Sequence, residues 1–263
     1  MSKDKNTRIF AIVNQKGGVG KTTTAVNLAT GLAASDVRTL VIDLDPQGNA
    51  STGLGIDRAH RTTTSYQILL KHVPVKAAIQ NTLVPNLDVI AASVDLSGAE
   101  IELVDDGKRE HRLREVLASA ELDYEFIFID CPPSLGLLTV NALVAADAVL
   151  VPLQCEFYAL EGLSHLIRTI ERVKRNLNPR LEIQGVVLTM FDGRNNLSGQ
   201  VAADVRGHFG DKVYETMIPR NVRVSEAPSF GKPVMLYDFQ SAGAQAYAHL
   251  AGEVLRREGR RVA

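Results

Sequence analysis

The chain has 263 residues, of which 45% are hydrophobic and 22% are charged, with a formal net charge of −1. This composition is typical of a globular protein and excludes a disordered chain. The near-neutral charge excludes a general attraction to nucleic acid, so such binding would need a local patch of Lys and Arg. The two cysteines, Cys131 and Cys155, form no CxxC pair, which disfavours a disulfide scaffold and a zinc site.

The distribution of apolar residues bears on cellular location. Residues 1–8 are polar and lack the apolar core of a signal peptide. No run approaches the roughly 18 apolar residues that are needed to span a bilayer. We therefore expect a cytoplasmic protein.

Short runs rich in Val, Ile and Leu alternate along the chain with longer helical patterns. The runs predict strands at residues 9–14, 39–44, 87–92, 125–130, 148–153 and 185–190. The longer patterns predict helices at residues 22–34, 99–118, 137–145, 160–177, 197–209 and 242–257. Because the runs mostly lack alternating polar residues, both faces of the strands should be covered. This order predicts one α/β domain over residues 1–263, with a doubly wound, mostly parallel sheet flanked by helices, and a less patterned surface excursion at 51–86.

A glycine-rich loop joins the first predicted strand to the first predicted helix. It reads Lys16-Gly17-Gly18-Val19-Gly20-Lys21-Thr22-Thr23. Glycines let backbone N–H groups turn inward around phosphate oxygens, and the following helix N-terminus adds its positive dipole end. We expect Lys21 to reach the β- and γ-phosphates and the Thr22 hydroxyl to ligate Mg²⁺. The loop therefore predicts a P-loop NTPase fold that binds ATP with Mg²⁺.

The loop departs from the standard G-x-x-x-x-G-K-[ST] spacing at its entrance. Gln15 occupies the first glycine position, and a second lysine, Lys16, follows it. This pattern resembles the deviant Walker A motif of the ParA/MinD family, in which the extra lysine reaches the nucleotide of the partner subunit. The resemblance implies a face-to-face homodimer around two ATP molecules, with Lys16 acting in binding and catalysis. A lysine supplied across an interface would neutralise charge that only a γ-phosphate brings.

Two acidic strand ends complete the predicted phosphate site. Asp45 follows the second strand and resembles the family's switch I residue that positions the attacking water. A carboxylate near a γ-phosphate is repelled unless a cation or water lies between, so orienting a water is a consistent role. The alternative is a strand-end cap that only shapes the loop. Asp130 ends the four-apolar run of a Walker B pattern and is expected to hold Mg²⁺ through a water.

Segments near the C-terminus resemble the part of the family that surrounds the base. Pro219 and Asn221 in the turn at 218–221 match residues that contact adenine in relatives. The absence of an Asn-Lys-x-Asp motif favours ATP over GTP only weakly. The resemblance covers nearly the whole chain and is strongest to the chromosomal ParA branch, whose members carry similar segments at 151–163 and 178–181.

The family resemblance also implies binding partners. ATP-bound dimers of this family bind double-stranded DNA without sequence preference, and Arg194 and Arg223 match positions that carry this binding. The alternative for each arginine is a solvated surface position. A dimer doubles the phosphate contacts of a small patch, which gives a physical reason to couple DNA binding to dimerisation. A ParB centromere-binding partner that stimulates slow ATP hydrolysis is implied too, as is association with the nucleoid.

The family resemblance implies a function in chromosome or plasmid partition, and three other functions are alternatives to it. A MinD-like membrane ATPase needs an amphipathic C-terminal helix, but residues 255–263 are basic, carry a glycine and have almost no large apolar face. We therefore expect no membrane binding. A reductase like the nitrogenase iron protein needs cluster-binding cysteines, whereas Cys131 and Cys155 have apolar surroundings typical of structural residues. A metabolic ligase or kinase needs residues for an acceptor substrate, and no candidate cluster is present.

Overall fold

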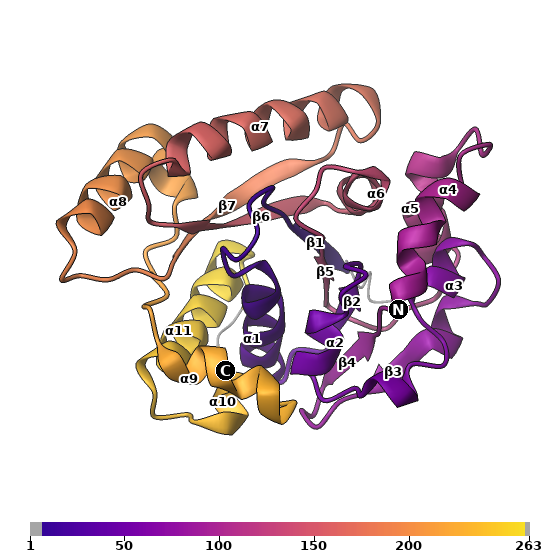
Figure 1. Cartoon of the computed structure of the whole chain (residues 1–263), viewed down its shortest axis with the longest axis horizontal. Coiled ribbons are helices and arrows are strands. Elements are labelled where there is room, and N and C mark those ends of the chain that lie inside the picture. The colour runs from indigo at the N-terminus through magenta and orange to yellow at the C-terminus, as the bar shows by residue number, and fades with distance from the viewer. Residues whose placement is uncertain (1–6, 261–263) are drawn as a thin grey trace.

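The computed structural model describes residues 7–260, and its centre is a seven-stranded sheet with the strand order β3-β4-β2-β5-β1-β6-β7 (Figure 1). The strands are β1 (Arg8–Ile12), β2 (Thr39–Asp43), β3 (Ile79–Asn81), β4 (Leu87–Ile90), β5 (Phe126–Asp130), β6 (Ala148–Gln154) and β7 (Glu182–Thr189). All neighbouring strands pair in parallel except β3, which runs antiparallel to β4. The prediction of a mostly parallel α/β sheet is confirmed, and β3 is an edge strand that it missed.

Helices cover both faces of this sheet. They are α1 (Lys21–Ala33), α2 (Asn49–Gly53), α3 (Ser65–Leu69), α4 (Ala99–Glu102), α5 (Arg112–Ala118), α6 (Leu137–Ala145), α7 (Ala159–Asn176), α8 (Asn196–Phe209), α9 (Val222–Glu226), α10 (Val234–Tyr237) and α11 (Ala242–Arg257). α1 and α11 lie on one face, and α6, α7 and α8 lie on the other (Figure 1). The doubly wound arrangement is therefore as the strand–helix order predicts.

Side chains of β1 show why both faces are covered. Phe10 and Ile12 pack toward α1 and α11, whereas Ala11 packs into the core on the opposite face. All three are completely buried, because successive strand residues point to opposite faces and each face has its own helical layer. On the α1 face the helices approach closely at Gly31, where an added Cβ would lie 2.8 Å from that of Ala251.

The predicted helix over residues 99–118 is wrong in its middle. The structure has two short helices, α4 and α5, separated by turns over residues 103–111. The Asp106 carboxylate accepts a hydrogen bond from the Lys108 N–H at 2.9 Å and pairs with Arg112. A local Asp-to-backbone bond of this kind competes with helical hydrogen bonding. The break leaves Ile101 on the surface, with 76% exposure, although its spacing suits a continuous helix.

Residues 51–86, predicted to be a surface excursion, contribute to the core as well. Ile68, Leu69 and Ala78 are completely buried against the sheet. The sequence did not predict the elements of this segment, because its helices and its edge strand are only three to five residues long. Elements this short show no clear hydrophobic periodicity.

Candidate nucleotide site

The glycine-rich loop lies at the carboxyl end of β1 and leads into α1. Gly18 and Gly20 have φ of 74° and 89°, a region that residues with a side chain rarely adopt. The space in front of Gly17 and Gly18 is open, since an added Cβ there would meet no atom within 4 Å. The loop therefore has the backbone shape and the free space that a phosphate group needs.

The two lysines of the loop differ in their surroundings. Lys21 is only 6% exposed, and its Nζ donates to the Lys16 carbonyl at 2.9 Å. Burial lowers the pKa of Lys21, and the Asp130 carboxylate partly offsets this effect. The Lys16 side chain is 53% exposed and forms an ion pair with Glu156. Lys21 thus lies inside the site of its own chain, and Lys16 lies at the surface.

Two side chains outside the motif hold the loop in place. Asn14 donates to the Pro152 carbonyl at 2.8 Å, and its side-chain oxygen accepts the Lys16 N–H at 3.0 Å. Thr189, at the end of β7, donates to the Val19 carbonyl at 2.8 Å. Sequence reasoning missed both positions. The available signal was that each is a polar residue at the carboxyl end of an apolar strand, the edge where α/β sheets bind ligands.

Asp130 ends β5 beside the loop and is completely buried. Within residues 7–260 neither of its carboxylate oxygens has a hydrogen bond of good geometry. Burial raises the pKa of Asp130 well above its ordinary value, the Asp43 carboxylate raises it further, and the nearby Thr22 hydroxyl lowers it. A buried carboxylate without partners next to a hydroxyl and an open phosphate loop suits a divalent cation held through water.

The described residues contain no group of three or more His, Cys, Asp or Glu side chains that could hold a metal. This finding is consistent with Mg²⁺, which binds one or two protein ligands and takes the rest from phosphates and water. Thr22 and Asp130 are the residues that fit such an ion. Asp43 does not, because its carboxylate already accepts two hydrogen bonds from Ser51, at 2.8 and 2.7 Å.

Asp43 lies opposite Asp130 in the sheet and anchors the start of α2. Burial raises the pKa of Asp43 to about 6, although the hydrogen bonds from Ser51 oppose this shift. Two buried carboxylates at neighbouring strand ends repel each other, and a cation beside them would relieve that repulsion.

Asp45 lies on the loop after β2 and is nearly buried. Its carboxylate accepts the Gln47 N–H at 3.0 Å, a contact that shapes the loop. Its negative charge also adds to the raised pKa of Asp130. The same charge opposes the larger lowering of the Lys21 pKa by burial, so Asp45 lies near both groups. The structure therefore brings Asp45, Lys21 and Asp130 together and shows the loop-capping contact of the alternative interpretation. The catalytic role of Asp45 stays a prediction.

Arg61 holds α2 and the turn that follows it, and sequence reasoning missed it. Its guanidinium donates to the Thr52 hydroxyl at 2.7 Å and to the Ile56 carbonyl at 2.9 and 3.1 Å. It also packs against Gly48, where an added Cβ would lie 2.1 Å from a guanidinium nitrogen. The φ of 65° favours a glycine at this position, and any side chain there would also displace the Arg61 guanidinium.

A cavity of about 470 Å³ opens on the other side of the phosphate loop. Gly20 and Thr23 line it together with Pro219, Asn221 and Tyr247. Its position beside the loop and its largely apolar side chains suit a planar base. The Asn221 side-chain oxygen caps α9 by accepting the Arg223 N–H at 2.9 Å, which leaves the amide NH₂ group as a possible donor to a ligand.

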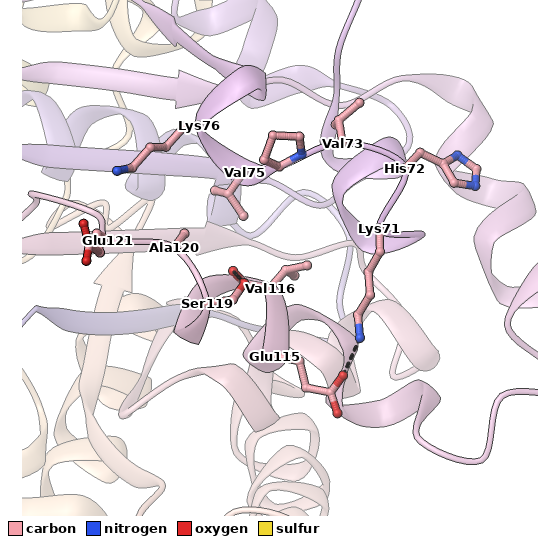
Figure 2. Close-up of a pocket in the computed structure, with 11 residues that line it drawn as sticks. Lys71, His72, Val73, Val75, Lys76, Glu115, Val116, Ser119, Ala120 and Glu121 are labelled. Carbon is pink, nitrogen blue, oxygen red and sulfur yellow. Dashed lines mark hydrogen bonds and ion pairs between the residues drawn. The ribbon is translucent and has the colours of Figure 1, made fainter.

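A second cavity, of about 640 Å³, lies elsewhere, between residues 71–76 and residues 115–121 (Figure 2). Lys71 reaches Glu115 across one side of it at 2.6 Å. No residue of the phosphate loop, of the Asp45 loop or of the turn at 218–221 lines this cavity. The nucleotide is therefore assigned to the first cavity, where the phosphate loop is.

Glu253 of α11 anchors the segment that leads to the base-side turn. Its carboxylate accepts the N–H groups of Glu215 and Thr216 at 2.8 and 3.0 Å and pairs with Arg257 at 2.9 Å. Burial alone would raise the pKa of Glu253, but the two backbone donors and Arg257 outweigh it and lower the pKa. A lowered pKa means that the contribution to stability is present at neutral pH and is lost as the pH falls through the folded-state value.

We expect Glu253→Gln to lower the free energy of unfolding by about 2 kcal/mol at pH 7, because buried donors lose a charged acceptor. The difference from the wild-type protein should shrink as the pH falls through the lowered folded-state pKa of Glu253, where the carboxyl itself becomes protonated. Urea unfolding at a series of pH values measures it, with the exposed Glu121→Gln as the control. A penalty that does not change with pH would contradict a role for the charge.

The two arginines predicted to bind DNA are both accessible. The Arg194 side chain is 91% exposed and pairs with Asp192 at 3.0 Å. Arg223, on α9, is half exposed and pairs with Glu226 at 3.0 Å and Asp238 at 3.4 Å. Each arginine is therefore balanced by carboxylates in this structure, and DNA binding through them stays a prediction.

The two cysteines lie after β5 and β6, with β1 between these strands. Both are buried, and burial raises the pKa of Cys131 well above its ordinary value and that of Cys155 to about 11. An iron–sulfur cluster needs thiolates, and one shared by two subunits needs them at the surface. The surroundings of both cysteines therefore favour a structural role.

Known proteins share both the sequence and the fold. The sequence model of a family described as an AAA domain matches residues 7–183. The chain is 65% identical over 253 residues to chromosome partitioning protein ParA of Caulobacter vibrioides, covering 95% of each chain. It is 56% identical over 247 residues to sporulation initiation inhibitor protein Soj of Bacillus subtilis, covering 94% of this chain and 98% of that one.

A solved structure is similar to this chain in both fold and sequence. Cobyrinic acid a,c-diamide synthase from Mycobacterium smegmatis, with bound ATP analogue and magnesium, has a TM-score of 0.86 to this chain. The two are 37% identical over 97% of this chain and 98% of that one. The matches extend over nearly the whole sequence and include the loop with Lys16 and Lys21. The chain therefore belongs to the ParA/MinD family of P-loop ATPases.

Proposed function

We propose that this protein is an ATP-dependent partition ATPase that works as a dimer on DNA. The observation that carries the proposal is the contrast between the two lysines of the phosphate loop. Lys21 is buried in its own site, whereas the Lys16 side chain lies at the surface. Lys16 is thus accessible to a nucleotide held by a second subunit. The name of the relative that is 65% identical to the chain, a chromosome partitioning protein, supports partition as the purpose.

ATP and Mg²⁺ are the cofactors of this proposal, and the solved relative that holds an ATP analogue with magnesium supports them. The phosphate groups would lie against the open backbone of Gly17, Gly18 and Gly20. Thr22 and Asp130 would hold Mg²⁺, which would neutralise part of the phosphate charge. The base would occupy the cavity lined by Pro219 and Asn221.

Hydrolysis would be an in-line attack of water on the γ-phosphate, which breaks the bond to the β-phosphate oxygen and releases ADP. Asp45 would hold and orient this water from the loop after β2. The Lys16 ammonium of the second subunit would stabilise the charge that develops on the phosphoryl oxygens. Turnover by the protein alone should be slow, because a switch has to persist in its ATP state, and a ParB-type centromere-binding partner would stimulate it.

DNA binding should depend on ATP and on ionic strength. Arg194 and Arg223 would contact backbone phosphates, and a dimer would present two copies of the pair. Each phosphate contact adds about −0.9 to the slope of log K against log salt concentration. Because a dimer makes twice as many contacts as one subunit, its affinity for DNA should be much higher and its salt slope steeper. DNA binding with ATP and with ADP across a salt series tests this proposal. Equal affinity with the two nucleotides would contradict it.

We expect Arg194→Glu combined with Arg223→Glu to weaken DNA binding at least about tenfold at physiological salt and to make the salt slope less steep. ATP binding and dimerisation should be unchanged. The matched control is Arg114→Glu with Arg180→Glu, two exposed arginines outside the proposed patch. The proposed patch would be wrong if both double variants retained wild-type affinity, or if both lost it equally.

The MinD-like alternative would place the protein on a membrane. Leu250, Val254 and Leu255 of α11 are completely buried in the core, so the helix presents no free apolar face there. Among residues 7–260 no helix is long and apolar enough to cross a bilayer. Residues 261–263, the end of the basic tail, lie outside the described residues. Sedimentation with liposomes in the presence of ATP tests this alternative, and co-sedimentation would favour it.

The ligase alternative has one relative in its favour, the synthase structure at 37% identity. The chromosome partitioning relative is considerably more similar to the chain, at 65% identity. We therefore favour partition, in which ATP hydrolysis drives a change of binding state and no second substrate is consumed.

A further inference from the structure

We propose that Glu156 is a latch that holds Lys16 within its own subunit and thereby sets the ATP threshold for dimer formation. The inference rests on the proposed function, because it concerns the lysine that would reach across the dimer. The Lys16 ammonium pairs with the Glu156 carboxylate of the same chain. Reaching across the interface to the phosphates of a partner's nucleotide would carry the ammonium away from the Glu156 carboxylate of its own chain. Dimerisation would therefore require the ion pair to open in both subunits.

The backbone of Lys16 is fixed, so opening the latch needs only a side-chain rotation. The Lys16 N–H donates to Asn14 at 3.0 Å, and its carbonyl accepts the Lys21 ammonium at 2.9 Å. With both backbone groups held, the side chain is the part that is free to move. It can exchange one acidic partner for another without any change in the phosphate loop.

The fold brings Glu156 to this position through strand order. β1 and β6 are neighbours, so the loop after β1 and the turn after β6 meet at the same edge of the sheet. The turn is well defined, because the Glu156 N–H donates to the Gln154 carbonyl and its carbonyl accepts the Ala159 N–H, at 2.9 and 3.0 Å. The Glu156 carboxylate is therefore presented beside Lys16 by the backbone itself.

The surroundings of the pair indicate that it lies on an interaction face. Phe157 and Tyr158 follow Glu156 directly and are 74% and 68% exposed. Their rings pack edge to face with centroids 5.1 Å apart. An exposed aromatic pair next to a partner-directed lysine is the composition expected of a subunit contact. Opening of the latch would thus occur where the second subunit arrives.

The strength of the pair suits a latch that ATP can open. Both side chains are partly exposed, and ion pairs of this kind change an equilibrium by up to about fivefold. Because two pairs open in each dimer, the effect on dimerisation could reach about twenty-five-fold. The charge of a γ-phosphate at the partner site is larger and less screened, so Lys16 should transfer once ATP is bound.

The first test is dimerisation of Glu156→Gln, measured by analytical ultracentrifugation with a non-hydrolysable ATP analogue. We expect the dimer dissociation constant to fall several-fold, by at most about twenty-five-fold. The matched control is Glu161→Gln, an exposed glutamate on α7 without an ion pair to a described residue, which should behave as wild type. An unchanged constant, or a weaker dimer, would overturn the proposal, because a weaker dimer would make Glu156 an interface contact.

The second test does not depend on dimerisation. We expect the Lys16 amine to react several-fold faster with acetic anhydride in Glu156→Gln than in the wild type, as read by peptide mass mapping without nucleotide. An unchanged rate would show that Glu156 does not hold Lys16, even if the proposed function is correct. Conversely, a Lys16→Ala variant that dimerises normally would refute the proposed role of Lys16, while the faster acetylation would still establish the pair.

A double variant tests whether Glu156 acts on dimerisation through Lys16. If Glu156 acts through Lys16, then Lys16→Ala with Glu156→Gln should fail to dimerise, as Lys16→Ala does alone. Stronger dimerisation of the double variant relative to Lys16→Ala would show that Glu156 acts by another route and would overturn the latch.

Discussion

Replacement of Asp45 by alanine should reduce partner-stimulated ATP turnover at least about a hundredfold, while ATP binding and dimer formation persist. The reason is that Asp45 lies in the same charge cluster as Lys21 and Asp130, beside the proposed place of the γ-phosphate. Without a group to orient the attacking water, the ATP dimer should accumulate and remain on DNA. Phosphate release in single-turnover conditions measures the chemical step directly.

Alanine at position 45 would remove both the charge and the hydrogen bond from the Gln47 N–H, so a second variant is needed to separate the two effects. Asp45→Asn keeps an oxygen that can accept the Gln47 N–H but removes the charge. If Asp45 orients the water, Asp45→Asn should be nearly as slow as Asp45→Ala. Wild-type turnover of Asp45→Asn would instead assign Asp45 the role of a loop cap. The exposed Asp57→Ala serves as the control for removal of a carboxylate from the neighbouring loop.

Replacement of Lys16 by alanine should weaken ATP-dependent dimerisation at least about a hundredfold. A hydrogen bond to a charged group contributes about 1.5–3 kcal/mol, and a symmetric dimer would lose two of them. ATP binding by the monomer should persist, because Lys21 and the glycine backbone are unchanged. Light scattering with ATP and equilibrium binding of a fluorescent ATP analogue separate the two effects.

Lys76→Ala is the matched control, since Lys76 is an exposed lysine that lines the cavity away from the phosphate loop. It should leave both dimerisation and ATP binding unchanged. A Lys16→Ala protein that forms the ATP dimer with wild-type affinity would refute the contact across the interface. The buried position of Lys21 would then explain ATP binding alone, and another residue would have to explain the dimer.

Local sequence patterns were sufficient for much of the fold and for the phosphate site. All six predicted strands are present, because runs of Val, Ile and Leu are buried on both faces wherever a parallel sheet is covered by helices. The phosphate loop could be predicted because its residues are contiguous, so Gly18, Gly20 and Lys21 are placed by one turn of backbone. The break near Asp106 was missed because a local hydrogen bond prevailed over an apolar spacing that suits a helix.

Which distant residues meet at the phosphate loop depends on the order of the strands in the sheet. Lys16 stands out in the sequence, but its partner Glu156 follows a strand that is distant in the chain and adjacent in the sheet. Thr189 likewise acts on the phosphate loop, although it is 170 residues from Val19 in the chain. The physical reason is that spacing along a chain reports one element at a time, whereas strand order determines which loops share an edge. The contiguous motif is enough to predict phosphate binding and to reveal two lysines. The packing of the sheet then buries one lysine and holds the other at the surface.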